Sequence, residues 1–150
     1  MNDILTGEFP VALDDKGRIS IPVRLRDKVP GNLLHITKGT NRCLWVFPPE
    51  EWGRASARWM QNASMPAKRR NEILHRFISP MQEVEMDRTG RIMVPPSLRD
   101  YAGLTHDCFV VGIGASIEIW DTESYRSYQE SIEGDFEEVM KDTSSDFFYG

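Results

Sequence analysis

A segment near the N-terminus recurs without gaps 73 residues further along the chain. Asp14–Asp27 aligns with Asp87–Asp100, and eight of these fourteen positions are identical. The same offset matches further turn, strand and helix positions, namely Gly39 with Gly112, Leu44–Phe47 with Ile117–Trp120, and Trp52 with Tyr125. Self-similarity at one offset is the signature of a structural unit that is used more than once. Because modules of about 50–70 residues bury little core alone, we expect the two copies to pack against each other or against further subunits.

Each copy indicates a hairpin loop, a short strand and a short helix, in that order. In the first copy, Asp15–Gly17 resembles a tight hairpin loop, with glycine where a positive φ is needed. Polar and apolar residues then alternate over Arg18–Pro22, which is the pattern of a half-buried strand. Pro22 and the equivalent Pro95 end these strands and favour the start of a helix.

The rest of each copy predicts two more strands and a closing helix. Apolar runs predict strands at residues 33–37, 44–47, 108–111 and 117–120. The closing helices begin near Pro49 and near Asp121 or Thr122. A further helix with a narrow apolar stripe is expected over 65–77, and the C-terminal residues 143–150 form either a loose tail or a docking segment. The predicted fold class is α+β, rich in β-structure.

Composition and charge exclude some classes of protein and leave DNA binding open. The chain is 40% hydrophobic and 27% charged, as in an ordinary globular protein. No apolar run approaches the roughly 20 residues that span a bilayer, and the N-terminus lacks the pattern of a signal peptide, so we expect no membrane contact and a cytoplasmic protein. The net charge of −5 divides into −8 over residues 118–150 and +3 over residues 1–117. Screening confines each field to about 8–10 Å, so the acidic third does not exclude DNA.

Motifs of catalysis, metal binding or cofactor binding are not found. The three histidines do not recur at the repeat offset, and the sequence has no zinc-protease motif, phosphate-binding loop or dinucleotide fingerprint. We therefore expect no catalytic residue, no metal and no cofactor, with a hydrolase whose site is assembled from distant residues as the alternative. Cys43 and Cys108 lack zinc-like spacing and are expected to be buried thiols, with a disulfide as the alternative.

The recurring polar feature is an aspartate four residues before an arginine. It occurs as Asp14 with Arg18 and as Asp87 with Arg91, each time with glycine just before the arginine. In a structural interpretation, the carboxylate caps the loop or pairs with the arginine, for about 0–1 kcal/mol if the pair is exposed. In a functional interpretation, the guanidinium is presented to an anion or to the edge of a guanine. The residues alone leave both interpretations open.

Further basic residues surround both loops, namely Lys16, Arg24 and Arg26 in the first copy and Arg88 and Arg99 in the second. A charge cluster is also what a solvated face looks like, so this observation only slightly favours an anionic partner. For a second basic patch, Lys68–Arg70 with Arg76, the polar face of a surface helix is the simpler explanation. The four tryptophans favour core or subunit contacts over stacking on bases.

The strings Leu13–Pro22, Asp87–Pro95 and Leu98–Leu104 closely resemble the MraZ family of bacterial regulators, over essentially the whole chain. This resemblance implies two SpoVT-AbrB modules, at residues 7–53 and 81–126. A linking helical segment would cover 54–80, and an acidic C-terminal helix and tail would cover 127–150. In that family the modules interlock as swapped hairpins into a pseudo-symmetric β-barrel within one chain, with flanking helices.

The resemblance also implies a function. Members of the family assemble into homo-oligomeric rings, commonly octamers or larger, and bind tandem repeats in the promoter of the division and cell-wall gene cluster, at the nucleoid. Their Asp-x-x-x-Arg motif is associated with binding double-stranded DNA, and it falls here on Asp14, Arg18, Asp87 and Arg91. The neighbouring bases Lys16, Arg24 and Arg88 are candidates by proximity. A structural or adaptor oligomer that acts through protein–protein contacts is the rival hypothesis, because the helices carry aromatic faces and the C-terminal third is acidic.

Overall fold

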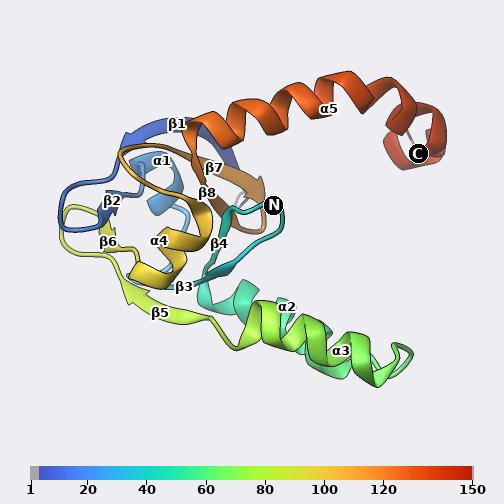
Figure 1. The fold of residues 1–150 in the computed structure, drawn as a ribbon, viewed down its shortest axis with the longest axis horizontal. Coiled ribbons are helices and arrows are strands. Elements are labelled where there is room, and N and C mark those ends of the chain that lie inside the picture. Colours follow the sequence, from blue (N-terminus) through green and yellow to red (C-terminus); the bar gives the residue numbers. More distant parts are fainter. Residues whose placement is uncertain (1–3, 150) are drawn as a thin grey trace.

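The computed structural model describes residues 4–149 and shows an α+β fold built around antiparallel strands (Figure 1). The strands are β1 (Leu5–Ala12), β2 (Arg18–Ser20), β3 (Leu33–Lys38), β4 (Leu44–Phe47), β5 (Gln82–Glu85), β6 (Arg91–Met93), β7 (Asp107–Gly114) and β8 (Ile117–Asp121). The helices are α1 (Val23–Arg26), α2 (Pro49–Gln61), α3 (Ala67–Ile73), the π-helical turn η1 (Leu74–Ile78), α4 (Pro96–Ala102), α5 (Thr122–Asp142) and α6 (Ser145–Tyr149). None of the helices within 4–149 is long and apolar enough to cross a membrane.

The two copies exchange strands. A six-stranded sheet runs in the order β1-β7-β8-β4-β3-β5, and β2 pairs with β6 in a separate two-stranded ladder. Strand β1 of the first copy pairs with β7 of the second, while β5 of the second copy pairs with β3 of the first. Neither copy could therefore complete its own sheet without the other.

A pseudo-twofold axis passes through the β2–β6 ladder. Ile19 lies opposite Ile92, which is its own equivalent in the other copy. Beyond the ladder, the Ile21 N–H donates to the carbonyl of Gly90 at 2.9 Å, and the equivalent bond joins Val94 to Gly17 at 2.9 Å. The loops that carry the repeated motif are thus fastened to each other's strands.

The closed barrel implied by the family resemblance is not formed by the described residues. The six-stranded sheet ends at β1 and β5, and β2 and β6 pair only with each other within their ladder. Each of these two strands is three residues long. Pro22 and Pro95 follow closely and have no N–H to donate, so they limit the length of this ladder.

A single offset does not relate the copies throughout. Lys38 lies opposite Leu44 in the β3–β4 ladder, and Gly112 lies opposite Ile117 in the β7–β8 ladder. Leu44 and Ile117 are equivalent at the offset of 73, so Lys38 is the structural equivalent of Gly112 and the offset between β3 and β7 is 74. The sequence match of Gly39 with Gly112 is therefore wrong by one residue.

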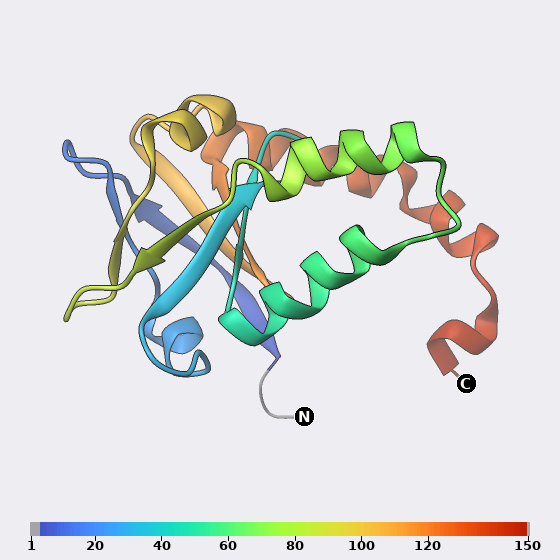
Figure 2. The same ribbon diagram turned by 90° about the horizontal axis from the view of Figure 1, so that it is seen from below.

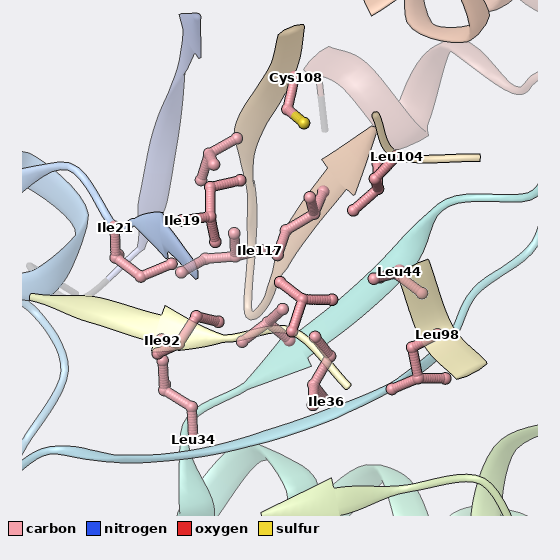
Figure 3. Packing of buried hydrophobic residues seen from close by; sticks show 14 of the residues in the cluster. Ile19, Ile21, Leu34, Ile36, Leu44, Ile92, Leu98, Leu104, Cys108 and Ile117 are labelled. Carbon is pink, nitrogen blue, oxygen red and sulfur yellow. The ribbon is translucent and has the colours of Figure 1, made fainter. Parts of the chain in front are cut away.

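One hydrophobic core serves both copies (Figure 3). It contains equivalent residues as pairs, namely Ile19 with Ile92, Leu25 with Leu98, Leu34 with Cys108, and Leu44 with Ile117, all at most 1% exposed. Full burial of an aliphatic side chain of this size contributes about 1.5–3 kcal/mol. The expected burial of both cysteines is confirmed, and both are free thiols.

Two groups of aromatic residues pack outside this core. Trp45, on β4, stacks on Phe77 of η1 at 4.9 Å between ring centroids and on Trp59 of α2 at 6.2 Å. On the same face of the sheet, Tyr128 in the second turn of α5 stacks on the buried Trp120 at 4.9 Å between ring centroids. The rest of α5 projects away from the sheet, as does the α2–α3 pair (Figures 1 and 2).

Candidate functional site

The first repeated motif forms a loop that its own aspartate holds closed. Asp14 Oδ1 accepts hydrogen bonds from the backbone N–H groups of Lys16 at 2.9 Å and of Arg18 at 2.8 Å. Asp14 Oδ2 accepts from Nε of Arg18 at 2.9 Å. Gly17 has φ of +83°, as the hairpin pattern predicts. One carboxylate therefore caps the loop and orients the arginine at the same time.

The second motif repeats this geometry. Asp87 Oδ1 accepts from the N–H of Thr89 at 2.9 Å and of Arg91 at 3.0 Å, and Oδ2 accepts from Nε of Arg91 at 2.9 Å. The hydroxyl of Thr89 adds a further bond to Oδ1 at 2.9 Å. Gly90 has φ of +81°. The two loops are equivalent in their hydrogen bonds as well as in their sequence.

Hydrogen bonds hold both carboxylates in the charged form. The backbone N–H of Arg18 is the main cause that lowers the pKa of Asp14, and the Arg18 side chain and the Lys16 N–H add to it. For Asp87, the N–H of Arg91 is the main cause of a pKa well below the usual range, with support from Thr89. At neutral pH each loop thus contains a carboxylate anion that pairs with an arginine.

The arginines keep a free edge. The bonds to aspartate use only Nε, and within residues 4–149 the Nη atoms of Arg18 and Arg91 make no hydrogen bond. Their side chains are 30% and 37% exposed. The structural interpretation of the motif is therefore right about the ion pair, and the pair still leaves each guanidinium able to donate to an acceptor outside the protein.

The outer face of the β2–β6 ladder carries both arginines. Arg18 lies opposite Met93 and Arg91 lies opposite Ser20, on either side of the central isoleucine pair. Residues opposite one another, and residues two apart on a strand, share a face of a sheet. Arg18, Arg91, Ser20 and Met93 therefore point away from the core, and Met93 is 47% exposed. Sequence reasoning missed Ser20 and Met93 as site residues, although their equivalence at the offset of 73 could have indicated them.

The remaining predicted residues lie in two places, in the loops beside this face and on α1. Lys16 and Arg88 are exposed in the loops. Both loops project from one end of the molecule, opposite the end where α3 and the later part of α5 project (Figure 2). Arg24 is not brought to the loops: on α1 it donates from Nη2 to Thr6 Oγ1 at 3.1 Å, near the start of β1. The structure thus groups six of the seven predicted residues and sets Arg24 apart.

Two further arginines support the loops from beneath. A Cβ atom on Gly17 would lie 2.6 Å from Cζ of Arg99, and one on Gly90 would lie 2.4 Å from Cδ of Arg26. Arg99 is fixed there by a bond from its Nε to the carbonyl of Val94 at 3.0 Å. Each copy thus places an arginine of its short helix under the loop of the other copy, so the close approach adds to the positive φ as a reason for glycine in both loops.

The loops do not coincide with a metal-like cluster or with a cleft of the described chain. Among residues 4–149, no three His, Cys, Asp or Glu side chains gather as a metal site would require. A cleft of about 550 Å³ lies between the start of β1, the start of α2 and the β7–β8 turn, and a shallower one of about 360 Å³ lies beside β1 and the start of α5. Neither cleft is lined by the loop residues.

Comparison with known proteins identifies relatives of the whole chain. It matches the family model described as "MraZ protein, putative antitoxin-like" twice, over residues 4–74 and 77–147. It is 40% identical over 137 residues to a protein of Treponema denticola named transcriptional regulator MraZ, covering 91% of this chain and 95% of that protein. Proteins of the same name from Treponema pallidum and Frankia alni are each 42% identical, over 90% and 91% of this chain and 91% and 94% of their own lengths.

Proposed function

This chain belongs to the MraZ family, and on that premise we propose that it is a transcriptional regulator that binds double-stranded DNA through the outer face of the β2–β6 ladder. The observation that carries the proposal is the pair Arg18 and Arg91, which share this face and keep their Nη atoms free. The relatives that support it bear the name transcriptional regulator.

The dimensions of the ladder suit the major groove of DNA. The groove is about 12 Å wide and admits a two-stranded β-ribbon. Arg18 and Arg91 are diagonal neighbours in the ladder, and such positions lie about 7–8 Å apart. This spacing is close to two base-pair steps of about 3.4 Å each. We infer that each arginine donates to the O6 and N7 atoms of a guanine, on base pairs about two steps apart.

The other residues of the face have separate roles in this proposal. Asp14 and Asp87 orient the arginines through Nε, while Lys16 and Arg88 contact phosphates from the loops. Arg24, which lies beside Thr6, contributes charge without touching bases. Met93 offers an apolar contact to a thymine methyl group, which Ser20 does not. The two ends of the ladder therefore read different bases.

A single subunit has too few contacts for tight specific binding. A good bidentate arginine–guanine pair gives about 1–3 kcal/mol of discrimination, and one chain offers two. We infer that several subunits, in a ring of eight or more at the nucleoid, bind tandem repeats in the promoter of the division and cell-wall genes. Linked contacts of this kind raise affinity by about 10²–10⁴. The exposed apolar residues Ile132, Phe136 and Val139 on α5 supply a surface for such an assembly.

The test compares Arg18→Ala and Arg91→Ala with Arg69→Ala, an exposed arginine on α3 away from the ladder. Affinity for a duplex with tandem promoter repeats and for a scrambled duplex is measured by fluorescence anisotropy, after the oligomeric mass of each variant has been checked. Each ladder variant should lose about 1–3 kcal/mol of discrimination, while Arg69→Ala should keep it. Wild-type discrimination in both ladder variants would contradict the proposal.

The rival function, a protein–protein adaptor, is supported by the exposed apolar residues of α5 and by the acidic C-terminal third. Salt dependence separates the two. Binding to DNA phosphates makes log K fall with log salt at about −0.9 for each phosphate neutralised. An adaptor would show no such binding to titrate.

A further inference from the structure

Three cationic side chains surround one aromatic ring at the other end of β3 from the Asp87 loop. Lys38 Nζ lies 5.2 Å from the centroid of the Tyr101 ring, and the guanidinium carbons of Arg42 and Arg76 lie at 4.9 Å and 4.7 Å. Lys38 lies on β3, Arg42 in the β3–β4 turn and Arg76 in η1, and the ring that they surround belongs to α4. We call this group the Tyr101 cluster.

The cluster lacks a salt-bridge partner among the residues that the structure describes. Within residues 4–149, no carboxylate forms a salt bridge with Lys38, Arg42 or Arg76. The distances to the ring hold any two of the charged atoms within about 10 Å of each other, which is about one Debye length at 0.1 M salt. Like charges therefore repel here, although the chain as a whole carries −5. A cation–π contact with the Tyr101 ring needs only one cation, so such a contact does not explain why three gather here.

Two departures from regular backbone bring the cations together. Asn41 and Arg42 have φ of +57° and +60°, the only residues other than glycine with positive φ in the described chain. A bulky side chain rarely adopts this conformation, which costs free energy and gathers at functional sites. Arg76 comes from the π-helical turn η1, and single π-helical turns are also frequent at functional sites. Its Nη2 donates to the hydroxyl of Tyr101, which in turn donates to the carbonyl of Gly39 at 2.7 Å.

The repeat shows that the cluster is not inherited from the duplication. In the pseudo-symmetric position, formed by the region after α1 and the β7–β8 turn, Lys28 stands in place of Tyr101, Gly112 in place of Lys38 and Ala115 in place of Arg42. The other half of the molecule thus folds in the same way without the cluster. The fold of the module therefore does not require the Tyr101 cluster.

We propose that Lys38, Arg42 and Arg76 form a phosphate-binding site beside Tyr101. Guanidinium groups bind phosphate in a bidentate manner, and a multiply charged phosphate group would neutralise the repulsion among the three cations. Arg42 and Arg76 are exposed and Lys38 is half-buried, so the site is open to solvent. The phosphate belongs either to a free phosphate compound or to the backbone of bound DNA.

The experiment uses the full chain and inorganic pyrophosphate as the probe. Binding is measured by calorimetry and by the thermal midpoint, with sodium chloride at equal ionic strength as the reference. Arg42→Asn removes one cation and keeps a residue that tolerates positive φ, and Arg69→Asn on α3 is the matched control for charge. Pyrophosphate should raise the midpoint of the wild type and of Arg69→Asn, and Arg42→Asn should bind it at least about tenfold more weakly, as expected for loss of a charge-assisted contact.

The variant without ligand gives a second readout that a structural role would not produce. Since the three cations repel, Arg42→Asn without pyrophosphate should be as stable as the wild type or more stable. Lower stability of the ligand-free variant, no response of the wild type to pyrophosphate, or an equal loss in Arg69→Asn would each overturn the proposal. So would a fall in oligomeric mass with pyrophosphate, because carboxylates of a neighbouring copy would then be the occupant.

Two further arms separate this site from the ladder and identify the source of the phosphate. Arg18→Ala should bind pyrophosphate like the wild type, so failure of the proposed function leaves this test intact. If duplex DNA abolishes pyrophosphate binding and Arg42→Asn lowers the salt slope by about 0.9, the DNA backbone occupies the site. If pyrophosphate still binds beside DNA, the source is a free phosphate compound. Both outcomes support the site.

Discussion

Arg18 and Arg91 are diagonal neighbours across the β2–β6 ladder, each opposite a residue that belongs to the other arginine's strand. Neither copy alone can bring this about, because the ladder forms only where the two copies meet. Each guanidinium is held through Nε by an aspartate of its own loop, and each loop rests on an arginine from the other copy. The spacing of the two arginines is therefore set by rigid backbone rather than by flexible loops.

The aspartates should matter for discrimination more than for affinity. Asp14→Asn removes a negative charge and the ion pair with Arg18 while it keeps a carbonyl oxygen to cap the loop. Because the face becomes more positive, affinity for a scrambled duplex should stay equal or rise. Discrimination should fall towards the 1–3 kcal/mol that one arginine contact supplies, because the guanidinium is no longer oriented. Anisotropy titrations at two salt concentrations measure both quantities, and an unchanged ratio of specific to non-specific affinity would argue against an orienting role.

The same carboxylates predict a pH dependence of stability. Hydrogen bonds hold the pKa of Asp14 and Asp87 below that of an unfolded aspartate, which is about 3.9. Their contribution to the free energy of unfolding is therefore complete above about pH 5 and is lost as the pH falls through the lowered folded pKa. As the pH falls below 5, the double variant Asp14→Asn/Asp87→Asn should lose less of its free energy of unfolding than the wild type does. Urea unfolding at a series of pH values tests this, and parallel curves for the two proteins would contradict it.

Glycine at position 17 should be needed for two reasons that a control variant can separate. Gly17 and Gly31 both have positive φ, at +83° and +71°, but only at Gly17 would a Cβ meet another group, the guanidinium of Arg99. Gly31→Ala should cost about 1–2 kcal/mol from the backbone alone. Gly17→Ala should cost about 1–3 kcal/mol more, because Arg99 must leave the carbonyl of Val94. The free energy of unfolding in urea gives the difference, and equal losses would show that Arg99 moves aside at no cost.

The sequence predicted the repeated glycine turn, the core positions that follow it and the burial of both cysteines, because each depends on local residue types. The prediction of a hairpin is wrong, because the strands on either side of each turn pair with strands of the other copy and not with each other. The sequence did not predict β1 or β5. Gly7 and Pro10 interrupt the pattern of β1, and Pro10 is tolerated because β1 lies at the edge of the sheet. Strand β5 is mostly polar, which also suits an edge. These strands are recruited by the other copy, and such pairing is not a local property of the sequence.

The site was predictable only as far as the repeat extends. Asp14, Arg18 and their equivalents recur in the sequence, so their ion pairs could be anticipated. That Arg18 and Arg91 share one face follows from the antiparallel register of β2 with β6, which joins residues 73 positions apart. The displacement of Arg24 towards Thr6 likewise results from the direction of α1 and could not be seen in the string of bases around the loop.

The exposed half of α5 should be needed for assembly and dispensable for folding. Tyr125 is buried against the sheet and Gln129 donates to Glu8 at 2.7 Å, whereas Ile132 and Phe136 are 39% and 45% exposed. The double variant Ile132→Glu/Phe136→Glu should therefore unfold within about 0.5 kcal/mol of the wild type per subunit, as surface substitutions do. If this stripe joins subunits, its oligomeric mass, measured by light scattering, should fall, and affinity for tandem repeats should fall more than affinity for one repeat, because linked contacts are lost. An unchanged mass would exclude α5 from the interface, and a lower mass with full affinity for tandem repeats would separate assembly from DNA binding.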